Sequence, residues 1–179
     1  MKCKKPLFNS IIGLAVMITL VGCTTHRTIP KEPGPHSSVG DITLDILVDD
    51  TTFKRCHAEE YTAQYFNFSN GFRYKGEKIA LIELFNTKYK PVEKNNQNGY
   101  VRIRFVVNCE GISGQFRVLE SDLDYKPFQF HPKITSQLLE ITKSLDGWLV
   151  VSDETNGPRD YYQYLIFKIK DGRIEELMP

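Results

Sequence analysis

Residues 99–121, GYVRIRFVVNCEGISGQFRVLES, decide the fold. In the first half of this stretch an apolar side chain stands at every second position, which is the period of a strand with one buried face. These apolar residues are Val101, Ile103, Phe105 and Val107. Two glycines within residues 109–114 break the alternation, and Phe116 and Val118 resume it. The stretch therefore predicts a β-hairpin whose apolar face has to be covered by other elements.

The composition indicates one folded domain behind a processed leader. The chain has 179 residues, of which 41% are hydrophobic and 12% aromatic, and this is not the profile of a disordered protein. The net charge is +1 at pH 7, so no strong basic field points to nucleic acid as a partner.

The N-terminus has the parts of a bacterial lipoprotein signal peptide. A basic start, MKCKK, precedes an apolar run over residues 11–22. This run has the length of a signal peptide and falls short of the roughly 20 residues that span a membrane. It ends in LVGC at residues 20–23, which resembles a lipobox. We therefore expect residues 1–22 to be cleaved and Cys23 to be lipidated, with an ordinary secretory signal and an incidental cysteine as the alternative.

Three segments are expected behind the leader. Residues 23–40 are rich in proline, glycine and serine, and they predict a flexible tether that follows the lipidated cysteine. Thr24 is not the aspartate that retains lipoproteins at the inner membrane, so we expect an anchor in the outer membrane that faces the periplasm. Residues 41–73 form an N-terminal extension, and residues 74–179 form the main domain.

The extension holds one clear pattern and one ambiguous one. Residues 41–48 alternate between polar and apolar side chains and predict a strand. Its apolar positions are Ile42, Leu44, Ile46 and Val48. Residues 53–66 carry aromatic side chains that are spaced for a helix but are also typical of a strand, so both remain open.

The main domain predicts two helices and two strands around the hairpin. Residues 77–89 predict an amphipathic helix, and a second helix begins at Pro132 and is closed by Gly147. Residues 161–170 predict a strand, and residues 174–177 a short final one. The apolar positions expected on one side of each helix are Ile79, Ile82, Phe85 and Tyr89 in the first, and Ile134, Leu138, Ile141 and Leu145 in the second.

This order of elements resembles the TonB C-terminal domain. The family's V-x-x-x-F-V-V strand, with its flanking glycines and second strand, matches Gly99, Val101, Phe105, Val106, Val107, Gly111, Val118 and Ser121. Later family residues match Trp148, the pair Gly157-Pro158 and the strand at residues 161–169. The resemblance implies an α+β fold, a two-layer domain with an antiparallel sheet of about three to five strands packed against two helices.

The resemblance also implies how a partner binds. An exposed sheet edge of the family accepts an extended segment of an envelope protein by strand addition. The matching edge here is the strand at residues 161–168, and its expected partner-binding residues are Tyr161, Tyr162, Tyr164, Ile166 and Lys168. These side chains would otherwise simply be half-buried sheet residues.

Force transmission is not expected, although a link to TonB-dependent transport receptors remains open. Energy-transducing members of the family have an uncleaved transmembrane helix and a long proline-rich arm, whereas this chain has a cleavable leader and a short tether. The alternative is a structural lipoprotein that homodimerises through the same edge. An enzyme or small-molecule binder would need a pocket between the sheet and residues 41–66.

The four cysteines have separate expected fates. Cys3 leaves with the leader and Cys23 carries the lipid, so Cys56 and Cys109 remain as an even pair in an oxidising compartment. We expect a disulfide between them, with two free thiols as the alternative. The cysteines and histidines follow no metal-site spacing, and the chain has no nucleophile elbow. We therefore expect no metal, no cofactor and no catalytic residue.

Overall fold

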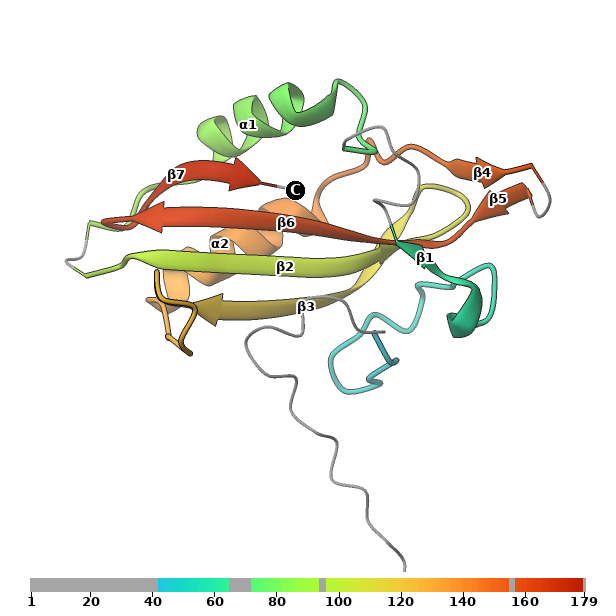
Figure 1. Cartoon of the computed structure of the whole chain (residues 1–179), viewed down its shortest axis with the longest axis horizontal. Coiled ribbons are helices and arrows are strands. Elements are labelled where there is room, and N and C mark those ends of the chain that lie inside the picture. The colour runs from blue at the N-terminus through green and yellow to red at the C-terminus, as the bar shows by residue number, and fades with distance from the viewer. Residues whose placement is uncertain (1–41, 65–71, 94–95, 155–156, 179) are drawn as a thin grey trace, which may run out of the picture. The chain divides into compact units, whose positions relative to one another are not determined.

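The computed structural model describes residues 42–64, 72–93, 96–154 and 157–178, which form an α+β fold (Figure 1). A mixed five-stranded sheet contains β1 (Ala63–Gln64), β2 (Gly99–Val107), β3 (Ser113–Ser121), β6 (Tyr161–Lys170) and β7 (Arg173–Met178). A separate two-stranded sheet contains β4 (Val151–Asp153) and β5 (Gly157–Arg159). The helices are α1 (Glu77–Lys88), α2 (Pro132–Lys143) and the 3-10 turn η1 (Glu59–Tyr61).

The predicted hairpin is confirmed as β2 and β3, which pair antiparallel from Tyr100 opposite Ser121 to Val107 opposite Ser113. The four alternating apolar side chains of β2 are all 0% exposed. The turn between the strands needs Gly111, whose φ of +80° lies in the left-handed region that favours glycine. On its other side β2 pairs with β6, so the hairpin supplies the centre of the sheet.

Both helices bury a common core against the same face of β2 and β6. In Figure 1, α2 lies behind the sheet and α1 lies beside β7. All four apolar residues expected on one side of the second helix are buried, although α2 ends at Lys143, before the expected end at Gly147, and Leu145 lies beyond it. In α1, Phe85 is buried and its ring lies 4.7 Å from that of Phe167. Leu81 is buried with it, whereas Ile79, which we expected on the buried side, is 69% exposed. Phe85 and Tyr89 are buried and Ile82 packs against the core as expected, so of the four expected positions only Ile79 is wrong.

The sheet is mixed rather than antiparallel, because β1 runs parallel to the start of β6. The strand order is β1-β6-β2-β3, and β7 pairs with the far end of β6. The expected short final strand is therefore confirmed as β7. The strand β6 has β2 on one side and both β1 and β7 on the other, so it lies inside the sheet.

The expected strand at residues 41–48 is wrong for the part of it that is described, residues 42–48, which form no strand. The chain turns at Asp45, whose carbonyl accepts hydrogen bonds from the amides of Val48 (3.1 Å) and Asp49 (2.8 Å). The two carboxylates accept amides of the same turn, Leu47 to Asp45 Oδ1 at 3.0 Å and Asp45 to Asp49 Oδ2 at 2.8 Å. These local bonds replace a strand ladder.

Residues 53–64 are neither of the two expected elements over most of their length, since they hold only η1 and the two residues of β1. They help to cover the second face of the sheet, opposite the helices. There Ile42, Val106, Tyr162 and Tyr164 form a small buried cluster against which Phe53 packs. Residues 65 and 66 lie outside the described residues.

No helix among the described residues is long and apolar enough to cross a membrane. The expected signal peptide, the lipidated Cys23 and the tether lie outside the described residues.

Candidate functional site

The strand expected to be an exposed edge is covered at both ends of that edge, by β1 beside Tyr161 and Tyr162 and by β7 from Ile166 onward. Tyr161 and Tyr162 are fully buried and pair with β1, and Tyr164 is 8% exposed. Ile166 pairs with Met178 of β7. The edge expected at residues 161–168 is occupied at both ends because β1 and β7 add to the same side of β6. The physical reason is that a two-residue and a six-residue strand share this side.

The polar ends of these side chains are engaged inside the protein. Tyr161 donates its hydroxyl to the carbonyl of Leu149 at 3.0 Å, and burial raises the pKa of this phenol. Tyr164 donates to Gln64 Oε1 at 3.1 Å. The hydrogen bond from Lys168 to Glu175, at 2.8 Å, raises the pKa of the lysine. Tyr161 therefore packs in the main core, and Tyr164 in the buried cluster on the second face of the sheet.

A groove of about 910 Å³ lies beside β3, and we call it the β3 groove. Residues 113–116 of β3 line it. Leu139 and Lys143 of α2 line it from the helix side, and residues 48–50 and 52–56 from the other. Among the described residues β3 pairs with β2 alone, apart from a bridge at its end between Ser121 and Pro127. The groove therefore lies beside the first four residues of an edge strand of the sheet.

A missing side chain and a bulge shape this edge. A Cβ at Gly114 would lie 2.3 Å from Cγ of Phe53, so the aromatic ring rests on the glycine backbone. Gln115 follows with a φ of +55°, where the pairing register between β2 and β3 shifts. Its buried side chain accepts a hydrogen bond from Arg55 Nε at 2.8 Å. The wall at residues 52–56 is thereby tied to β3.

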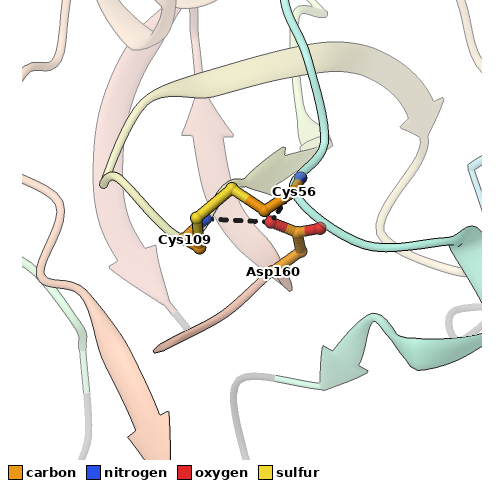
Figure 2. Close-up of side chains that lie close together, drawn as sticks. All are labelled: Cys56, Cys109 and Asp160. Atoms are coloured by element: carbon orange, nitrogen blue, oxygen red, sulfur yellow. Dashed lines mark hydrogen bonds between the residues drawn. A yellow bond between two sulfur atoms is a disulfide. The ribbon is translucent and has the colours of Figure 1, made fainter. Parts of the chain in front are cut away.

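The expected bridge between Cys56 and Cys109 is confirmed, and the alternative of two free thiols is wrong (Figure 2). The disulfide lies at one end of the groove wall formed by residues 52–56. Cys56 is exposed and lines the β3 groove. The fully buried carboxylate of Asp160 lies beside both cysteines. It accepts the amides of Cys56 (3.2 Å), His57 (2.8 Å) and Cys109 (2.9 Å). Asp160 thus joins the extension, the hairpin turn and the start of β6.

The side chains of Cys56, Cys109 and Asp160 place their possible ligand atoms within 4.8 Å of one another, which is the spacing of a possible metal site. Both sulfurs are nevertheless bonded to each other, and metal binding requires thiolates. The carboxylate already accepts three amides. With the disulfide formed, the cluster therefore acts as a structural cross-link.

A second tie holds the extension at the other end of the groove wall. Arg117 of β3 donates to both carboxylate oxygens of Asp49, at 2.6 and 2.7 Å. The hydrogen bonds from Arg117 hold the pKa of Asp49 below its ordinary value, and Asp49 in turn raises the pKa of the guanidinium. Arg104 stands directly opposite Arg117 on β2, so Asp49 also offsets a repulsion between like charges.

The side chains around the β3 groove combine an apolar floor with charges of both signs. Phe116 and Leu139 are half-buried against the main core, and Lys143 Nζ lies 6.0 Å from the ring of Phe116. Lys54 is a second exposed base, and exposed acids stand at Asp50 and Glu110. Such a surface suits an extended segment with alternating apolar and charged side chains.

None of these groove residues was among the expected partner contacts. One signal for them exists in the sequence, because a glycine inside a strand pattern marks a bulge or a close approach, and Gly114 has both. The segment that lies over it is set by long-range contacts of Phe53 and Arg55, which no local pattern shows.

Comparison of the chain with protein-family models, with curated proteins and with solved structures found no match in any of the three.

Proposed function

We propose that this chain is a lipoprotein of the outer membrane, facing the periplasm, that binds an extended segment of another envelope protein in the β3 groove. The observation that carries the proposal is an edge strand along a groove of about 910 Å³. An edge strand presents backbone N–H and C=O groups to an added strand, while adjacent pockets select its side chains. A helix on one side of such an edge gives the added strand a surface to pack against.

The anchor part of the proposal rests on the leader. The basic start, the apolar run over residues 11–22 and the LVGC sequence all agree with lipidation of Cys23. The disulfide supports an oxidising compartment, where such bridges persist. Neither binding by strand addition nor the anchor requires a cofactor.

We further propose that residues 74–179 have a TonB C-terminal-like fold. The order α1, β2–β3 hairpin, α2 and β6, with both helices on one face, supports this. The site differs from the one that the resemblance implies, because β1 and β7 occupy the side of β6 on which a partner was expected. The partner strand is accordingly assigned to β3.

Site-specific photocrosslinking in native envelopes tests the proposal. The photoreactive residue replaces Ile112, which is 53% exposed and lines the β3 groove. The control replaces Ile79, which is 69% exposed on α1 and does not line the groove. We expect one defined partner from Ile112 and none from Ile79. Capture from both positions alike would contradict the proposal, and self-crosslinks alone would favour the homodimer.

A charge reversal checks that the captured partner occupies the groove. Lys143→Glu changes an exposed lysine on the groove, and Lys133→Glu changes an exposed lysine of the same helix outside it. We expect the first change to weaken crosslinking from Ile112 and the second to leave it unchanged. Equal effects of the two changes would place the partner elsewhere.

A further inference from the structure

The turn at residues 44–48 exposes an unusual amount of apolar surface for so short a segment. The exposed fractions are 54% for Leu44, 73% for Ile46, 90% for Leu47 and 67% for Val48. Three of these residues are consecutive. Folded proteins rarely expose such runs unless the run binds something.

The turn holds these side chains in a defined arrangement. Asp45 accepts the amides of Leu47, Val48 and Asp49, two through its carbonyl and one through its carboxylate. Asp49 returns the contact, because its carboxylate accepts the amide of Asp45 at 2.8 Å. Reciprocal bonds of this kind specify one turn conformation. The apolar tip, Ile46-Leu47-Val48, is therefore presented outward by the turn.

The tip is also fastened to the body of the protein. Besides its bonds to Asp49, Arg117 donates a hydrogen bond to the carbonyl of Thr43 at 2.7 Å. One side chain of β3 therefore binds the residues that precede and follow the turn. The side chain of Asp49 is only 2% exposed. Arg117 thus offsets the charge of Asp49, one of the acidic residues beside the tip.

The position of the tip in the chain indicates what it meets. The described chain begins at Ile42, and residues 24–41, which separate it from Cys23, reach at most about 60 Å when extended. Among the described residues, the tip is thus the first run of consecutive exposed apolar side chains after the expected anchor.

We propose that Ile46, Leu47 and Val48 insert into the interfacial region of the membrane that carries the lipidated Cys23. This inference rests on the proposed anchor, and of the three tip residues Val48 also lines the β3 groove. A small convex group of apolar side chains beside a lipid anchor acts as a second membrane contact, and lipidated proteins commonly use two. The insertion would hold the domain in one orientation on the membrane.

Tryptophan fluorescence in reconstituted vesicles tests the insertion. The mature chain, isolated from the membrane fraction, is placed in phosphatidylethanolamine–phosphatidylglycerol vesicles that contain brominated lipids. Leu47→Trp is the reporter, and Ile79→Trp is the control at another exposed position. The native Trp148 is 5% exposed, so it contributes a constant background.

We expect bromines near the top of the acyl chains to quench Leu47→Trp, because an interfacial contact lies about 5–10 Å into the boundary region. The control should be quenched no more than the unsubstituted chain. Equal quenching of reporter and control would overturn the proposal. So would a reporter that is blue-shifted without quenching, since that result indicates burial against protein or a second copy.

The mass of the N-terminal peptide separates this proposal from the anchor on which it rests. Acylated Cys23 without quenching of Leu47→Trp would overturn the insertion and leave the anchor intact. A Cys23 without acyl chains would overturn the anchor. In that case the Leu47→Trp protein would be added to the vesicles from solution, and quenching of its tryptophan by the brominated lipids would decide the insertion by itself.

Discussion

Two segments of this chain have nearly the same alternation of apolar and polar residues and adopt different structures. In β2, residues 101–107 form a strand whose alternating side chains are fully buried. Residues 42–48 form no strand, and only Ile42 of their four alternating apolar residues is buried. The same period therefore led to opposite environments for most of its apolar side chains.

The difference lies in what each segment's backbone pairs with. Between its two neighbouring strands, β2 has ladders on both sides and helices over its apolar face. In residues 42–48 the carboxylates of Asp45 and Asp49 bind the amides of the turn instead. Alternation marks a segment that is able to form a strand, and the available ladder decides whether it does.

Deleting a core ring should have the largest effect. Phe105→Ala removes a fully buried ring of β2 whose centroid lies 5.0 Å from that of the Trp148 ring. The change should lower the free energy of unfolding by about 3–5 kcal/mol. Phe53→Ala, in the extension, should cost less than half as much because Phe53 is only half-buried. Urea denaturation measures both. Equal losses would mean that the extension is packed as tightly as the hairpin.

The disulfide should come next. Replacing both Cys56 and Cys109 by serine opens a link between residues 53 positions apart and should cost about 2–4 kcal/mol. The bonds of Asp160 and Arg55 remain, so the extension should stay on the sheet. Hydrogen exchange of the variant checks this. Loss of protection throughout residues 52–64 would show instead that the disulfide alone holds the extension.

The tie between Asp49 and Arg117 should have a smaller, pH-dependent effect. Because the folded state lowers the pKa of Asp49 from its ordinary 3.8, this contribution is complete well above pH 4 and is lost as the pH falls toward the folded-state pKa. Asp49→Asn should therefore cost about 1 kcal/mol at pH 6 and less at pH 3.

Urea denaturation at the two pH values measures this difference. The control is Asp124→Asn, at an exposed carboxylate 3.8 Å from Lys126. It should change stability little at either pH. A cost for Asp49→Asn that stays constant down to pH 3 would contradict the assigned ion pair.

The apolar tip should matter least for stability. Leu47→Ser alters a side chain that is 90% exposed and should change the free energy of unfolding by less than about 0.5 kcal/mol. Thermal or urea denaturation of the unanchored protein in detergent-free buffer measures it. A large destabilisation would mean that the tip is packed against the protein rather than presented outward.

Most of the fold followed from local patterns in the sequence. The hairpin, both helices and the last two strands form where periodicity and turn residues placed them, because each is reinforced by a ladder or by an apolar face on the core. In α1 only Ile79 departs from the expected buried side, since Ile79 and Leu81 are equally apolar and the packing of the helix on the core decides which of them is buried.

Local sequence patterns could not predict most of the candidate site. The parallel addition of β1 to β6 and the antiparallel addition of β7 are long-range events, and together they put the expected edge inside the sheet. The β3 groove likewise depends on the extension folding back over Gly114. Only the pair Cys56 and Cys109 linked the extension to the hairpin in the sequence itself.

Native-state hydrogen exchange of the whole chain tests the contrast between the two segments most directly. We expect the amides of residues 101–107 to exchange only through global unfolding, and those of Leu47 and Val48 to exchange many times faster through local opening of an exposed turn. Equally slow exchange in both segments would show that residues 42–48 are a paired strand, and would contradict both the turn and the outward-facing tip.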